Sequence, residues 1–271
     1  METAIFPRLK EFADTHGLYL DHKGKRACRS GVRCTWMDNN GNKHDLDYVL
    51  ERGGSSSALG APVAFIEIAW RRYTKHSRNK AQEIQGAIEP LAETYCRSLP
   101  FKGAVLAGEF TEGALRQLRS LGFGIVYFPY NAVVEAFGKV GIDASTDEST
   151  PDYVVLNKIE QWDRLSPRRK KLVVKALVEN NDTEITEFLA ALTETVCRRI
   201  VEIVILPLHG QELLATSIGE AMAFLKTYNE AVAQVRFERY EIRLRFRNGN
   251  EITGRFNDRP SAIEFLEAYE N

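Results

Sequence analysis

Two carboxylates lie in or beside apolar segments in the first quarter of the chain. Asp47 comes directly before Tyr48-Val-Leu50, and Glu67 stands within the run from Phe65 to Trp70. A carboxylate in such a run costs free energy unless it has a partner. Two carboxylates on adjacent strands also repel each other unless they share a cation. Because Mg²⁺ needs only one or two protein carboxylates, Asp47 and Glu67 are expected to hold Mg²⁺, with Mn²⁺ able to substitute.

A basic segment follows Glu67 directly. Residues 71–80 contain five lysines and arginines, with one histidine and one tyrosine among them. A helix that begins near Ser77 would add backbone N–H donors, which favour an anion. This segment is therefore expected to bind DNA phosphates beside the metal. The residues expected to make these contacts are Arg71, Arg72, Lys75, His76 and Arg78.

Simpler arrangements of the same residues stay open. Asp45 shares a strand face with Asp47 and could be the ligand in its place. Glu67 could pair with Arg71 or Arg72 at the end of a strand. The whole basic segment could also be a solvated turn.

The elements that must position these side chains follow from apolar spacing and turn residues. The spacing predicts helices over residues 3–16, from Ser77 onward and over 111–121. The predicted strands cover residues 32–37, 43–51, 63–70, 102–108 and 124–129, the first two as a hairpin. A strand, helix and strand with short connections indicate a parallel pair with a right-handed crossover. Residues 1–150 are therefore predicted to form an α/β unit with a mixed central sheet flanked by helices.

The pattern changes in residues 151–271. Residues 152–234 are expected to be mainly helical, and no internal repeat is expected. Polar and apolar residues then alternate over 240–256 around Asn248-Gly249, which predicts a β-hairpin. A short helix over residues 261–269 closes the chain.

Composition narrows the class of protein. The chain has 271 residues, 44% of them hydrophobic, with a formal net charge of −1, so any nucleic-acid contact needs a local basic patch. No apolar run reaches the roughly 18 residues of a membrane helix, and a signal peptide is not expected. Four cysteines without zinc-type spacing are expected to be reduced thiols of a cytoplasmic protein. Glycine-rich phosphate loops are missing, which disfavours a nucleotide-binding enzyme.

The order of these elements, with Asp on one strand and Glu on the next, resembles the PD-(D/E)XK nuclease superfamily. Within it the chain is most similar to type II restriction endonucleases. The matching pieces are Asp47-Tyr-Val-Leu, Pro62-Val-Ala-Phe-Ile-Glu-Ile and Gly103-Ala-Val-Leu-Ala-Gly, and the resemblance covers residues 1–140. It implies a Mg²⁺-dependent, sequence-specific endonuclease of double-stranded DNA that acts as a homodimer. Residues 151–271 would then serve recognition or dimerisation.

One position departs from the family pattern. The family has lysine two residues after the glutamate, where this chain has Ala69. The resemblance therefore leaves two readings. In the first, a lysine of the following helix has taken over the catalytic role, and Lys80 is preferred to Lys75. In the second, the chain is a catalytically inactive DNA-binding protein of the same fold, its lysine lost naturally or by engineering.

Overall fold

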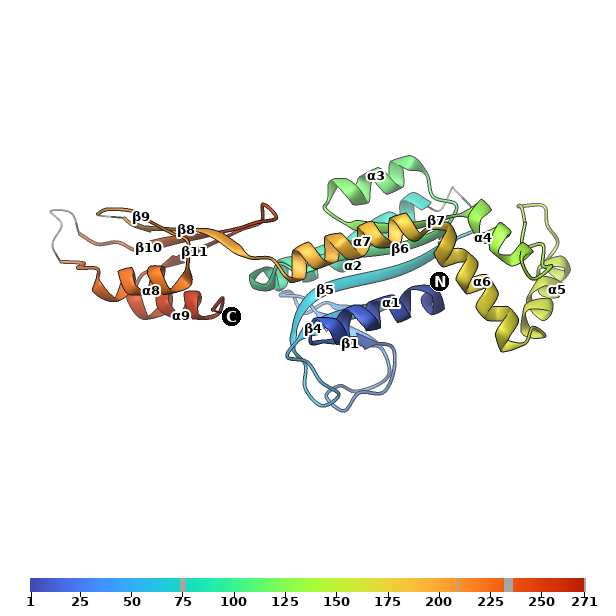
Figure 1. Cartoon of the computed structure of the whole chain (residues 1–271), viewed down its shortest axis with the longest axis horizontal. Coiled ribbons are helices and arrows are strands. Elements are labelled where there is room, and N and C mark those ends of the chain that lie inside the picture. Colours follow the sequence, from blue (N-terminus) through green and yellow to red (C-terminus); the bar gives the residue numbers. More distant parts are fainter. Residues whose placement is uncertain (74–76, 209, 232–235, 271) are drawn as a thin grey trace. The chain divides into compact units, whose positions relative to one another are not determined.

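The computed structural model describes residues 1–73, 77–208, 210–231 and 236–270 (Figure 1). The chain divides into two compact units, Met1–Val196 and Cys197–Asn271. The division falls after Val196 rather than after residue 150, because two further helices complete the first core. These helices, α6 (Pro167–Asn180) and α7 (Asp182–Val196), bury Val173, Leu177, Phe188 and Leu192 in the same cluster as the sheet. No helix in the described ranges is long and apolar enough to cross a membrane.

The first unit is built on a five-stranded mixed sheet in the order β1-β4-β5-β6-β7. Antiparallel pairing joins β1, β4 and β5, and parallel pairing joins β5, β6 and β7. The mixed central sheet flanked by helices, predicted from the sequence, is therefore confirmed. The strand bounds are β1 Leu18–His22, β4 Tyr48–Arg52, β5 Ala61–Arg71, β6 Phe101–Gly108 and β7 Gly124–Pro129.

Helices cover both faces of this sheet because each presents an apolar stripe to it. On one face lie α2 (Ser77–Thr94) and α3 (Glu112–Ser120), and α2 buries Ala81, Ile84, Ile88 and Leu91 at helical spacing. The other face packs against α1 (Glu2–Thr15), α4 (Tyr130–Gly138), α6 and α7. A further helix, α5 (Asp152–Asp163), contributes no fully buried residue. Phe65 and Ala69 of β5 point toward α2, and the intervening Glu67 shares their face.

The strand predicted over residues 43–51 is two strands that part at Asp47. The first, β3 (Lys43–Leu46), pairs only with β2 (Cys34–Met37) in a separate two-stranded sheet. The second, β4, turns into the main sheet between β1 and β5. Asp47 therefore occupies the point where the chain leaves one sheet and enters another.

The second unit is a four-stranded antiparallel sheet in the order β11-β10-β8-β9, with α8 and α9 packed against it and against each other. The hairpin and closing helix predicted from the sequence are confirmed, as β10, β11 and α9. The prediction of a mainly helical stretch over residues 152–234 missed β8 and β9. The bounds are β8 Ile200–Pro207, β9 Leu213–Ala215, α8 Ile218–Thr227, β10 Tyr240–Phe246, β11 Glu251–Phe256 and α9 Arg259–Glu267.

This unit contains an internal repeat, which the sequence analysis did not expect. Both halves run strand, strand, helix, and the two first strands lie side by side. Ile203 pairs with Leu244, and Ile205 pairs with Ile242. If Ile203 is equivalent to Ile242 and Ile205 to Leu244, exchanging the two halves turns each of these pairs into the other. The helices repeat as well: Ser217 caps α8 and Asp258 caps α9, each accepting a hydrogen bond from a backbone N–H. The unit is thus a tandem pair of ββα motifs with a period of roughly 40 residues.

Candidate metal centre

The structure brings Asp47 and Glu67 together on adjacent strands. Tyr48 pairs with Ile66, which leaves Asp47 and Glu67 next in line across the β4–β5 ladder. The backbone N–H of Ile68 donates a hydrogen bond to Asp47 Oδ2 at 2.7 Å, which fixes the direction of that carboxylate. Asp47 is half-buried, and Glu67 is 9% exposed. Two carboxylates thus share a site with little access to water.

Glu67 is held in an environment that disfavours its charge. Burial, followed by the negative charge of Asp47, raises the pKa of Glu67 to about 8, although Lys80 opposes the shift. Its Oε1 atom is buried and finds no hydrogen-bond partner among the described residues. Burial also raises the pKa of Asp47, against the Ile68 N–H, and Glu2 adds to the increase. An unpartnered buried oxygen beside a second carboxylate is the arrangement that a cation would stabilise.

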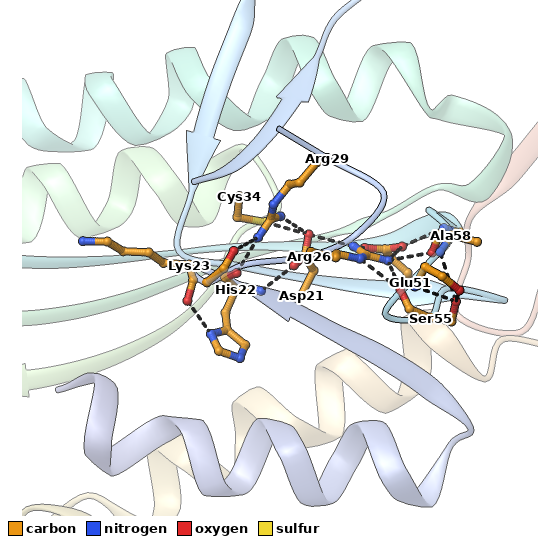
Figure 2. Close-up of polar contacts among 12 residues, drawn as sticks. Asp21, His22, Lys23, Arg26, Arg29, Cys34, Glu51, Ser55 and Ala58 are labelled. Carbon is orange, nitrogen blue, oxygen red and sulfur yellow. Dashed lines mark hydrogen bonds and ion pairs between the residues drawn. The ribbon is translucent and has the colours of Figure 1, made fainter. Parts of the chain in front are cut away.

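A second group of buried carboxylates shows how the same fold neutralises charge for a structural purpose (Figure 2). Arg26 Nη1 lies 2.8 Å from Asp21 Oδ2 and also contacts Glu51, whose Oε2 accepts from Arg26 Nη2 at 2.9 Å. Arg29 supplies a second cation to Asp21, and Gly60 N–H donates to Glu51. Arg26 further donates to backbone carbonyls of the loop that follows β4. Asp21 and Glu51 are fully paired, whereas Glu67 is not.

Lys80 lies near enough to both carboxylates to act on their charge. It stands on α2, the helix that covers the Glu67 face of the sheet, and its charge lowers the pKa of both Asp47 and Glu67. Its Nζ is 3.1 Å from Glu83 Oε2, which also accepts from Arg71 at 3.4 Å. Glu83 therefore helps to hold the lysine from the solvent side.

Ala69 does not border an open space. It is 3% exposed and belongs to the apolar cluster formed with α2 and α3. Ala69 therefore leaves no room for an ammonium group, because the neighbouring side chains fill the space around it. A lysine at position 69 would have to be buried among them.

The donor set fits Mg²⁺ better than a metal that demands many protein ligands. The described residues hold no group of three or more His, Cys, Asp and Glu placed to share an ion. Two carboxylates suit Mg²⁺, which keeps several waters, and Glu67 Oε1 is available for the purpose. The alternative ligand Asp45 is engaged elsewhere, since it accepts from Thr35 Oγ1 and from Arg33 at 2.7 Å.

The basic segment does not form a row of free cations. Arg71 is paired with Glu83. Arg72 donates to the backbone carbonyl of Asp147 at 2.7 Å and lies over the Tyr73 ring. Lys75 and His76 fall outside the described residues. Arg78 is exposed and forms no ion pair with a described residue, so it is the phosphate contact that the geometry favours most.

Sequence reasoning missed Glu2, which stands in the first turn of α1. Its negative charge raises the pKa of both Asp47 and Tyr48, so it lies near the candidate centre. The sequence carries no signal for this, because the approach depends on how α1 packs on the sheet.

Comparisons with known proteins add little. No family model matches the chain, and no curated protein matches it. Among solved structures it is similar to a protein of unknown function, AF1548, with 12% identity and a TM-score of 0.29. That match covers 70% of this chain and 91% of the other. A likeness this slight carries no argument about fold or chemistry.

Proposed function

We propose that the first unit is the catalytic core of a Mg²⁺-dependent deoxyribonuclease. In full, the proposal is a sequence-specific endonuclease that hydrolyses phosphodiester bonds of double-stranded DNA. The observation that carries it is Glu67 Oε1, which is buried, unpartnered among described residues and next to Asp47. The resemblance of residues 1–140 to PD-(D/E)XK nucleases gives these two residues the same task.

Each residue of the centre has a role that its placement supports. Asp47 and Glu67 would hold the metal, with the Ile68 N–H keeping Asp47 in position. Bound Mg²⁺ would neutralise phosphate charge and make a water more acidic. Lys80 would offer its ammonium where negative charge grows on the phosphate in the transition state. Arg78 would contact a phosphate further along the same DNA strand.

The partners follow from the proposed reaction. Cutting both strands of a symmetric site requires two related centres, so we expect a homodimer. The second unit, Cys197–Asn271, would serve recognition or dimerisation. The four cysteines, all within the described residues, form no disulfide, and we place the proposed reaction in the cytoplasm.

A second function is favoured by one observation. Ala69 stands where the family has its lysine, and it is packed into the core. If Lys80 cannot replace that lysine, the chain binds DNA through the same fold without cutting it.

Incubation of the full chain with a large mixed DNA substrate tests the proposal directly. We expect discrete fragments with Mg²⁺ or Mn²⁺ and intact DNA with EDTA. Asp47→Asn and Glu67→Gln should each abolish cleavage and reduce the increase in Tm that Mg²⁺ causes. Asp45→Asn is the matched control and should keep both properties, because its carboxylate is engaged by Thr35 and Arg33.

The outcomes separate the readings. Binding without cleavage by the parent chain would establish the inactive alternative. Full activity in Glu67→Gln would refute the proposed centre, and loss of activity in Asp45→Asn alone would move the metal to that residue. A smear in place of discrete fragments would show that the chain cuts DNA without sequence specificity. The proposed phosphodiester hydrolysis would then stand, and the proposed specificity would not.

A further inference from the structure

An aromatic pair stands at the end of β5, just beyond the candidate centre. Trp70 is 42% exposed, and its ring centroid lies 6.3 Å from that of Tyr130 with the ring planes tilted by 38°. Tyr130 is anchored, because its hydroxyl donates to the Thr146 carbonyl at 2.9 Å and accepts from the Thr146 N–H. The indole therefore has a fixed aromatic neighbour and an open area.

The backbone beneath Trp70 is also fixed. Gly108 has φ +93°, and a Cβ at that position would lie 3.2 Å from Trp70 Cζ3 and 2.1 Å from the Arg71 carbonyl oxygen. That carbonyl accepts from the Glu109 N–H at 2.8 Å. The ring thus rests against a glycine that no other residue could replace. An indole fixed in place loses little conformational freedom when a planar group stacks on it.

The position of Trp70 relative to Glu67 limits what can reach both. Trp70 is three residues further along β5, which corresponds to about 10 Å of extended strand. Side chains alternate along a strand, so the odd spacing places the two on opposite faces of the sheet. A substrate in contact with both must pass around the end of β5. Duplex DNA has a persistence length of roughly 150 base pairs, so a tight turn costs it free energy that an unpaired strand does not have to supply.

We propose that Trp70, backed by Tyr130, stacks an unpaired nucleobase next to the phosphate that a metal ion at Asp47 and Glu67 would hold. The substrate would then carry at least one unpaired nucleotide beside the cut: a strand end, a flap or a base turned out of the duplex. This inference rests on the proposed phosphodiester hydrolysis and narrows its substrate, because a cut within double-stranded DNA then requires a base turned out of the duplex at the recognised site. Aromatic stacking tolerates any base, so it adds affinity without adding sequence specificity.

Binding can be measured apart from cleavage through tryptophan emission of the full chain in EDTA. Trp36 is 6% exposed and Trp162 packs on the Phe137 ring, so quenching by DNA reports mainly on Trp70. The probes are a single-stranded oligonucleotide, a blunt duplex of the same length and a duplex with a flap. We expect quenching with the single strand and the flap, and little with the blunt duplex.

Variants then assign the effect, with affinities measured by anisotropy of labelled oligonucleotides. Trp70→Ala should weaken binding of the single strand and the flap by roughly 5- to 150-fold and leave the blunt duplex unchanged. Trp70→Phe should retain most of the affinity, and the salt dependence should keep its slope because no phosphate contact is lost. Tyr153→Ala removes another exposed aromatic of the same unit, 73% exposed, and should change nothing.

The results that would overturn the inference are definite. Equal affinity of Trp70→Ala and the parent for the flap would remove the stacking role. An equal loss on blunt duplex and flap would show a general defect, and Tm values of the variants would reveal any unfolding. If Trp70-dependent binding appears and no substrate is ever cut, the stacking platform stands and the proposed hydrolysis fails.

Discussion

Replacing Glu67 by glutamine should remove a specific pH dependence from the stability of the metal-free chain. The pKa of Glu67 is about 8 in the folded state against an ordinary value of 4.5. Below pH 4.5 the Glu67 carboxyl is protonated in both the folded and the unfolded chain, so burying it costs no charge and the folded state keeps its full stability. Between pH 4.5 and 8 the unfolded chain has released the proton and the folded chain retains it, so stability falls as pH rises. Above pH 8 the carboxyl is ionised in both states, and the stability falls no further from this cause.

The size of the effect follows from the same interval. Each pH unit between 4.5 and 8 lowers the free energy of unfolding by about 1.4 kcal/mol, so the full interval lowers it by about 5 kcal/mol. That is an upper value, because water penetration and relaxation soften the environment of a buried charge. It is large beside the roughly 5–15 kcal/mol that stabilises an ordinary domain. Glu67→Gln should therefore match the parent near pH 5 and exceed it by several kcal/mol near pH 9.

The measurement is urea unfolding in EDTA at pH 5, 7 and 9, followed by tryptophan emission. All three tryptophans, at positions 36, 70 and 162, lie in Met1–Val196, so the signal reports on the first unit alone. Glu93→Gln, an exposed change on α2, is the control and should stay within about 0.5 kcal/mol of the parent at every pH. A gap between parent and Glu67→Gln that is the same at all three pH values would refute the reasoning.

Two further changes test other parts of the structure. Lys80→Ala should lower the rate of DNA cleavage by roughly 10²- to 10³-fold and leave DNA affinity nearly unchanged, because its ammonium is needed where charge develops. Lys175→Ala, an exposed lysine of α6, is its control in the same cleavage assay, and normal cutting by Lys80→Ala would contradict the role. Arg26→Ala should cost about 3–5 kcal/mol in urea unfolding, because Glu51 would be left buried without its cation and Asp21 would keep only Arg29. The control Arg164→Ala breaks only an exposed ion pair within a helix and should cost less than about 1 kcal/mol. An equal loss of stability in both variants would disprove the argument.

The central βαβ part of the fold was predictable because its signals are local. The strands β6 and β7 are short apolar runs, and Thr111 caps α3 as its sequence position suggests, accepting from the Ala114 N–H. The division of residues 43–51 at Asp47 was not predictable, because no glycine or proline marks the break between the two strands. The five-residue β1 was missed because it follows directly after the α1 stop and ends in polar residues.

Asp47 and Glu67 stood out in the sequence because they lie beside or within apolar runs, where a charge needs a partner. The Asp21, Arg26 and Glu51 cluster gave no such signal. Its members come from a strand, a loop and another strand, and only the folded chain shows that they neutralise one another. The sequence thus located the carboxylates of the candidate centre. The structure showed which other buried carboxylates already have an arginine partner.

The internal repeat escaped the sequence analysis because its two halves differ at many of their equivalent positions. Ile203 and Ile242 keep the same character, since both lie under the helices that the repeat places on one face of the sheet. On the exposed face Val204 faces Arg243 across the middle of the sheet, so equivalent positions carry different chemistry. Packing against the helices constrains only the buried face, so the exposed positions of the two motifs are free to differ.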